Sequence, residues 1–142
     1  MLLHCAGRVL DLSCPRVMGV LNITPDSFSD GGELLLDARP RIERVLRRAA
    51  RMMAGGAAII DVGGESTRPG AARVGEQEEI DRVLPVVEAL LARFDAVVSV
   101  DTSSPRLIRE AASLGAGMVN DVRALGREGA MAAVRDAGVA VC

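Results

Sequence analysis

Four short apolar segments recur along the chain, and each of them ends in an asparagine or an aspartate. They comprise residues 17–23 with Asn22, 57–62 with Asp61, 96–100 followed by Asp101, and 118–122 with Asn120 and Asp121. Apolar runs without alternation are typical of strands buried on both faces of a parallel sheet. Helical patterns separate these runs, so the order strand, helix, strand, helix predicts an α/β fold.

The connecting segments carry helix signals. Asp37 is the predicted N-cap of a first helix, whose apolar residues recur at helical spacing over residues 42–53. A second helix is expected to start near Glu76, and Pro85 predicts a kink or an early end for it. Ser104 is the predicted cap of a third helix.

The two ends of the chain add smaller elements. Residues 2–5 and 9–12 are short apolar segments that predict a β-hairpin. Near the other end, residues 128–137 predict a short fourth helix, and residues 139–142 predict the start of a fifth strand.

Two architectures accommodate such a chain, a doubly wound sheet and a (β/α) barrel. Polar residues end each of the first four strands, and barrel enzymes place their chemistry at the carboxyl ends of many strands. A doubly wound sheet uses a single switch point, and no GxGxxG motif follows the first strand. We therefore predict a (β/α)8 TIM barrel, with residues 1–142 as the N-terminal portion of one domain. Residues 1–16 are the expected capping hairpin, and residues 17–142 supply the first four βα units and the start of strand 5.

Composition excludes several classes of protein. The net charge is -2, with no basic run and no aromatic platform, so we expect no nucleic-acid partner. No apolar run reaches about 18 residues and no signal peptide is visible, so we expect no membrane span and a cytoplasmic protein. The three cysteines lack CxxC spacing and are expected to be reduced, structural thiols. The only histidine, His4, lies in the predicted hairpin, which argues against a Ser-His-Asp or His-metal mechanism.

Residues 18–32, MGVLNITPDSFSDGG, run from the first strand into a loop. An ordinary turn explains Pro25, Asp26 and the glycines, but neither Asn22 nor Phe28. The amide oxygen of Asn22 is a neutral, hard ligand suited to Mg²⁺, which takes one or two protein ligands beside waters and phosphate oxygens. The alternative is an amide that ties down its own loop.

Residues 63–75 are predicted to form a second, glycine-rich loop, and the stretch 61–70 that leads into it reads DVGGESTRPG. Gly63 and Gly64 permit close backbone approach. Arg68 offers a planar fork of donors for phosphate or carboxylate, and Thr67 adds a hydroxyl group. The alternative is a solvated arginine.

Asp101 and Asp61 end apolar strands, where an unpaired buried carboxylate is costly. Asp101 therefore requires a partner, which is either a bound ligand, a helix N-terminus or an internal salt bridge. Ser103 and Ser104 lie nearby and make capping by Asp101 less necessary. Asp61 is expected to orient its neighbours by hydrogen bonds rather than to contact a ligand, and Asp121 is ambiguous in the same way.

The segments MGVLNITPDSFSDGG and DVGGESTRPG closely resemble the two signatures of the dihydropteroate synthase family. The resemblance continues through VSVDTS and VNDVR to the end of the chain. It implies a TIM-barrel transferase of folate biosynthesis, which condenses 4-aminobenzoate with 7,8-dihydropterin-6-ylmethyl diphosphate. The products are 7,8-dihydropteroate and diphosphate, and the full-length members of the family are expected to be homodimers.

The resemblance also implies which residues bind the substrates and the metal. The positions that match are Asn22, Phe28, Asp30, Thr67, Arg68, Pro69, Asp101 and Asn120. Asn22 would contact Mg²⁺ and diphosphate, Thr67 would contact the pterin diphosphate, and Asp101 and Asn120 would lie in the pterin pocket. The other four would help to build or enclose the aminobenzoate and diphosphate sites. Of all eight, Asp101, Asn120 and Arg68 are the predicted catalytic residues.

The family's enzymes have roughly twice this length, as a full barrel of about 250 residues requires. The chain therefore resembles an N-terminal half, without the family's later aspartate, lysine and arginine-histidine ligands. A half barrel exposes a sheet edge and apolar faces, so we expect the chain alone to be inactive and to self-associate or aggregate. Two alternatives are a related pterin-binding methyltransferase barrel, which holds a methyl-pterin near a corrinoid, and a non-catalytic half-barrel.

Overall fold

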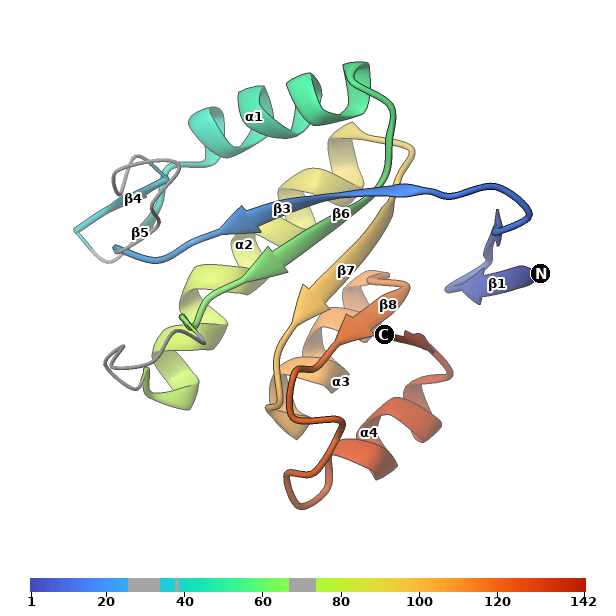
Figure 1. Cartoon of the computed structure of the whole chain (residues 1–142). Coiled ribbons are helices and arrows are strands. Elements are labelled where there is room, and N and C mark those ends of the chain that lie inside the picture. The colour runs from blue at the N-terminus through green and yellow to red at the C-terminus, as the bar shows by residue number, and fades with distance from the viewer. Residues whose placement is uncertain (26–33, 38, 67–73) are drawn as a thin grey trace.

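The computed structural model of the chain describes residues 1–25, 34–37, 39–66 and 74–142 (Figure 1). Its centre is a parallel sheet of five strands in the order β3-β6-β7-β8-β9. These are β3 (Val17–Asn22), β6 (Ala57–Gly63), β7 (Val97–Asp101), β8 (Met118–Asn120) and β9 (Ala140–Val141). Within the described residues each strand pairs with the next parallel strand along the chain, without the reversal that defines a doubly wound sheet. The sheet is an arc of a (β/α) barrel, so the predicted fold class is confirmed.

A helix follows each of the first four strands of this sheet (Figure 1). The helices are α1 (Ile42–Ala54), α2 (Glu76–Arg93), α3 (Pro105–Leu114) and α4 (Ala130–Ala137). Consecutive helices contact one another, and one buried apolar core lies between α1, α2, α3 and the sheet. Burying one such side chain contributes about 1.5–3 kcal/mol, so this layer dominates the stability. None of the four helices in the described part of the chain combines the length and apolarity that a bilayer-spanning segment needs.

The first helix begins later than predicted. Helix α1 starts at Ile42, with Arg41 as its N-cap residue and no side-chain cap. Asp37 instead follows β4 (Leu35–Leu36), which pairs with β5 (Arg39–Pro40) in a small hairpin that the sequence analysis missed. Asp37 has a φ of 48°, a conformation that a short polar side chain tolerates. The same property makes aspartate common in caps and in turns, which is why the prediction of a cap was wrong.

Proline 85 does not shorten the second helix. Helix α2 runs from Glu76 to Arg93 as a single element, with Pro85 inside it. Pro85 lies on the exposed side of the helix, where water can hydrogen-bond to the carbonyl group that the missing N–H leaves free. The expected early end at this residue is therefore wrong.

The fourth strand and the fourth helix are both shorter than predicted. Strand β8 ends at Asn120 rather than at residue 122, because the Asp121 carboxylate accepts hydrogen bonds from the backbone N–H groups of Arg123 and Leu125. These bonds curl the chain into a turn. Helix α4 starts at Ala130, directly after a glycine with a φ of 82°.

The inner face of the sheet carries side chains in three tiers. Ile60 and Val62 of β6 pack in the core with the helices, so Ile59, Asp61 and Gly63 belong to the opposite face. Strand register then assigns the tiers. The lowest contains Met18, Ile59 and Val97, the middle one Val20, Asp61, Ser99, Met118 and Ala140, and the uppermost Asn22, Gly63, Asp101 and Asn120. We call the uppermost tier, at the carboxyl ends of the strands, the rim.

The N-terminal hairpin covers the end of the sheet opposite the rim. It consists of β1 (Leu2–Cys5) and β2 (Arg8–Asp11), as predicted. Its apolar side chains pack against the lower and middle tiers; the cluster comprises Cys5, Leu3 and Leu10 with Met18, Ile59, Val97, Met118 and Ala140. Arg8 also forms an ion pair with Asp95, at 2.9 Å. The hairpin therefore leaves the rim free.

Gly117 offers a test of this packing. A Cβ atom on Gly117 would lie 2.8 Å from backbone and side-chain atoms of Cys5, which are held in β1. We expect Gly117→Ala to destabilise the protein by about 1–3 kcal/mol, measured as thermal or denaturant unfolding, because the hairpin must move. The matched control is Gly55→Ala, whose Cβ would meet only ordinary contacts of 3.4 Å. Equal stability of the two variants would contradict the packing.

Candidate functional site

The rim brings together three polar side chains that the sequence analysis selected. Asn22, Asp101 and Asn120 occupy one tier on β3, β7 and β8, and each is half-buried. Figure 1 shows these strands ending at the same edge of the sheet. The side chains are therefore accessible to a molecule bound over the end of the arc.

Gly63 leaves the space between two of these side chains open. A Cβ atom on Gly63 would lie 3.4 Å from Asn22 Oδ1 and 3.7 Å from Asp101 Oδ2. The two oxygen atoms therefore face a common point on the rim. A larger residue at Gly63 would occupy the space that a ligand of both oxygens needs.

Gly64 has a different role at the start of the second loop. A Cβ atom there would lie 2.8 Å from Val83 and 3.2 Å from the Glu79 carbonyl oxygen. The chain can pass this close to α2 only because the residue is glycine. The guanidinium group of Arg82 adds a hydrogen bond to the Gly64 carbonyl oxygen, at 2.9 Å. Both features fix where the second loop leaves the sheet.

Asp61 lies one tier below the rim and is 1% exposed. Its Oδ2 atom accepts a hydrogen bond from Asn120 Nδ2 at 3.0 Å. Its Oδ1 atom is buried and has no hydrogen-bond partner among the described residues. The bond to Asn120 is the kind of orienting contact that the sequence analysis expected of Asp61.

The electrostatic environment of Asp101 disfavours its charged form. Burial raises the pKa of Asp101 to about 6, helped by the nearby carboxylates of Asp61, Asp121 and Glu79 and opposed by Arg123. No hydrogen bond to this carboxylate is found within the described part of the chain. The group is therefore a half-buried acid that keeps its proton to a higher pH than an exposed aspartate does.

Asp121 forms hydrogen bonds within the segment that follows β8. Burial acts to raise its pKa, but hydrogen bonds from the Ser103 hydroxyl and from the backbone N–H groups of Arg123 and Leu125 together lower it. Ala124 and Leu125 have φ values of 52° and 58°, which are unfavourable for residues with a Cβ. The carboxylate holds the turn in this conformation through these bonds, which are the supporting contacts that the sequence left as one of two alternatives.

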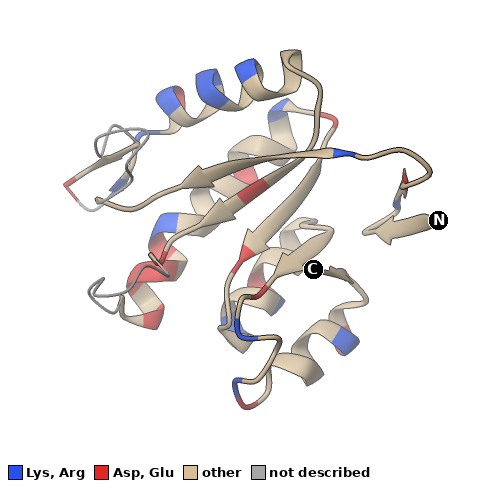
Figure 2. Cartoon of the chain, viewed as in Figure 1, with Lys and Arg blue, Asp and Glu red and all other residues tan. Residues whose placement is uncertain are grey.

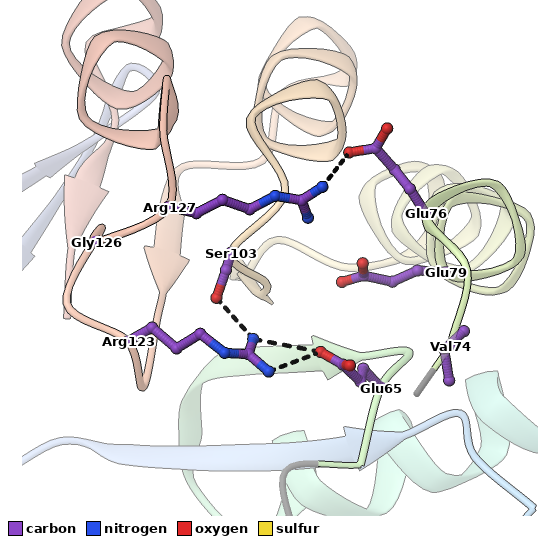
Figure 3. Close-up of a pocket in the computed structure, with 8 residues that line it drawn as sticks. All are labelled: Glu65, Val74, Glu76, Glu79, Ser103, Arg123, Gly126 and Arg127. Carbon is purple, nitrogen blue, oxygen red and sulfur yellow. Dashed lines mark hydrogen bonds and ion pairs between the residues drawn. The ribbon is translucent and has the colours of Figure 1, made fainter. Parts of the chain in front are cut away.

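Two arginines of the β8–α4 connection hold the neighbouring segments together. Arg123 lies 3.3 Å from Glu65, in the first part of the second loop, and donates a hydrogen bond to the Ser103 hydroxyl at 2.9 Å. Arg127 forms an ion pair with Glu76, at the start of α2, at 3.3 Å. Both arginines line one cavity, which has a volume of about 680 Å³. Figure 3 shows Arg123 extending toward Glu65 and Arg127 toward Glu76. The residues that line it are Glu65, Val74, Glu76, Glu79, Ser103, Arg123, Gly126 and Arg127.

Two buried charged residues of α2, Glu79 and Arg82, were not predicted from the sequence. Glu79 and Arg82 are 6% and 4% exposed, and Glu79 accepts a hydrogen bond from the Thr102 hydroxyl at 2.6 Å. Burial raises the pKa of Glu79, while the bond from Thr102 acts to lower it. Their positions, one turn before the buried Val83 and Val86, would have placed both charges on the buried face of α2. That helical spacing was the available signal.

Five of the predicted site residues lie outside the described residues. They are Phe28 and Asp30 in the first loop and Thr67, Arg68 and Pro69 in the second. Their assigned roles stay predictions.

Charge is distributed unevenly around the site. Figure 2 marks acidic residues on the strands of the sheet and basic residues along α1. The described residues contain no group of three or more His, Cys, Asp or Glu side chains that could enclose a metal ion. The rim does offer the Asn22 amide oxygen and the Asp101 carboxylate, which are oxygen ligands of the type that Mg²⁺ prefers. The residues fit an ion with one or two protein ligands and do not fit an all-protein cage.

Comparison with known proteins decides the family. Residues 18–142 match the family described as pterin binding enzyme. The chain belongs to this family. Dihydropteroate synthase of Escherichia coli K12 is 54% identical over the whole chain, which covers 49% of that protein. This member of the pterin-binding family therefore spans about half the length of that curated relative.

Solved structures of relatives share the fold. Dihydropteroate synthase of Yersinia pestis, in complex with a sulfonamide drug, is 54% identical with a TM-score of 0.91, over 100% of this chain and 50% of the other. The enzyme of Xanthomonas albilineans with 4-aminobenzoic acid is 49% identical with a TM-score of 0.87, over 99% and 50% of the two chains. The strands and helices of this pterin-binding protein therefore match about half of each of those structures.

The raised pKa of Asp101 predicts that this residue lowers the free energy of unfolding by an amount that depends on pH. The folded protein holds the Asp101 proton more tightly than the unfolded chain, whose pKa is near 3.8, so this group lowers stability as pH rises from about 4 to above 6. We expect Asp101→Asn to be more stable than the wild type at pH 7 and to lose that advantage at pH 4. Denaturant unfolding across this range measures the difference. A difference that is constant with pH would contradict the assignment.

Proposed function

We propose that residues 1–142 supply the first portion of the single barrel domain of a dihydropteroate synthase. The reaction would join 4-aminobenzoate to 7,8-dihydropterin-6-ylmethyl diphosphate and release diphosphate. One observation carries the proposal: Asn22, Asp101 and Asn120 share one rim tier in a chain 54% identical to the Escherichia coli enzyme. We further propose a cytoplasmic setting, where the three cysteines, which are all free, stay reduced.

The pterin ring would bind at Asp101 and Asn120. A pterin offers adjacent N–H donors, and a carboxylate can accept two of them at once. The Asn120 amide adds a donor and an acceptor to the same heterocycle. Burial of Asp101 supports this role, because a half-buried carboxylate without a protein partner interacts strongly with a positively charged ring.

The diphosphate would lie toward Asn22, with Thr67 and Arg68 as further donors from the second loop. Asn22 Oδ1 and the open space beside Gly63 support a small cation at this point, which would be Mg²⁺. Magnesium there would neutralise charge on the departing diphosphate. Phe28, Asp30 and Pro69, with Arg68, would enclose the aminobenzoate and exclude water.

The chemistry then depends mainly on positioning. The bond between the methylene carbon and the diphosphate oxygen breaks, and its electron pair leaves with the diphosphate. The pterin ring carries the resulting positive charge, which the Asp101 carboxylate stabilises. The amine of 4-aminobenzoate attacks the methylene carbon and releases one proton to solvent. Holding the reactants in this arrangement supplies most of the rate enhancement.

The pocket assignment is testable in a complete barrel. We define this as residues 1–142 fused to the part of the Escherichia coli relative that this chain does not cover; the covered part is 54% identical. Asp101→Asn or Asn120→Ala should weaken pterin binding on the order of 10-fold to 100-fold, because each removes a hydrogen bond in a desolvated site. Calorimetry with 6-hydroxymethylpterin measures the affinity. Unchanged affinity in both variants would place the pterin elsewhere.

We expect residues 1–142 alone not to convert the substrates to product. The arc leaves apolar side chains exposed on the first and last strands of the sheet: Val17 is 59%, Val20 44% and Val141 45% exposed. We propose that these surfaces drive self-association, and that the family's dimers form from complete barrels. Light scattering should show species larger than the 14.9 kDa monomer. Product formation by a verified monomer would refute the proposal.

A further inference from the structure

Asn120 is held by two hydrogen bonds, one to its backbone and one to its side-chain amide. The backbone carbonyl oxygen of Asn120 accepts a hydrogen bond from the Thr102 N–H group at 3.0 Å, which fixes the end of β8 to the chain beyond β7. The side chain is fixed by Asp61, whose Oδ2 atom lies 3.0 Å from Asn120 Nδ2. The remaining freedom is a rotation that exchanges the oxygen and nitrogen atoms of the amide.

The Asp61 carboxylate excludes that exchange. An ionised carboxylate only accepts hydrogen bonds, so the NH2 group of Asn120 must face it. The reversed amide would set two oxygen atoms against each other in a site where Asp61 is 1% exposed and water does not screen them. Asn120 Oδ1 is therefore directed away from Asp61.

We propose that Asp61 is the positioning residue that makes Asn120 present its amide oxygen to an N–H group of the bound heterocycle. The inference rests on the proposed function, because it takes the pterin site to lie at the rim. Asp61 sits one tier below the rim, so it sets the orientation of Asn120 from beneath. The ligand would be an azaheterocycle with a ring N–H donor, as a dihydropterin has.

The stability cost of Asp61 favours this role over a purely structural one. Its Oδ1 atom is buried without a hydrogen-bond partner among the described residues, and such an atom destabilises the folded protein. Asparagine would fill the same volume without a buried charge, but its amide could pair with either orientation of Asn120. Only the acid selects one orientation.

A double-mutant cycle in the complete barrel tests the inference. The variants are Asp61→Asn, Asn120→Ala and their combination, and the probe is 6-hydroxymethylpterin in calorimetry. Asp61→Asn should weaken binding on the order of 5-fold to 10-fold, as one net hydrogen bond implies. The double variant should bind as Asn120→Ala does, because Asp61 acts only through Asn120. Ser99→Ala is the matched control: Ser99 neighbours Asp61 in the same tier, its hydroxyl has no described partner, and its loss should change affinity less than about twofold.

The outcomes separate the inference from the proposed function. If the wild-type barrel does not bind the pterin, the proposed function fails. If it binds and Asp61→Asn binds equally well, or if the two substitutions have additive effects, the positioning role is wrong and the function stands.

A reciprocal exchange covers the case in which Asp61→Asn does not fold. Asp61→Asn combined with Asn120→Asp restores a donor–acceptor pair between the two positions with the roles exchanged. We expect this variant to fold and still to bind weakly, because a carboxylate replaces the amide at the rim. Recovery of wild-type affinity would overturn the inference.

Discussion

The register of four neighbouring parallel strands is the constraint on which the candidate site depends. It sets Asn22, Gly63, Asp101 and Asn120 at one level, although they span nearly one hundred positions of the chain. A shift of one residue in any strand would turn that strand's polar side chain into the apolar layer under the helices. The packing of Ile60, Val62, Val98 and Val100 against the helices therefore also positions the rim.

The carboxylates at this edge of the sheet differ in how many hydrogen bonds they accept from the protein. Asp121 accepts three hydrogen bonds and shapes a turn, and Glu79 takes one from Thr102. Asp61 is satisfied on one oxygen only, and Asp101 carries a pKa raised to about 6. The least satisfied acids lie nearest the open rim. Such uncompensated charge lowers stability and is what a site prepared for a ligand requires.

The segments around the rim are tied to one another by charged side chains from α2 and from the β8–α4 connection. Arg82 binds the Gly64 carbonyl oxygen and pairs with Glu78, while Arg123 and Arg127 reach Glu65 and Glu76. The partly exposed ion pairs of Arg123 and Arg127 each contribute about 0–1 kcal/mol. Their effect on the site is geometric, since they flank both ends of the second loop.

The sequence by itself determined the fold class, the alternation of strands and helices, the hairpin, the Ser104 cap and the polar strand ends, because each depends on local periodicity or on one residue's chemistry. It misjudged Asp37 and Pro85, where the same local propensity serves two conformations. Only the tertiary structure decided that Asp61 holds Asn120, that Asp121 shapes a loop and that Arg82 is buried. The bonds of Asp61 to Asn120, of Ser103 to Asp121 and of Arg82 to Gly64 join residues that are distant in the chain, and their geometry follows from register and packing, which one-dimensional patterns do not contain.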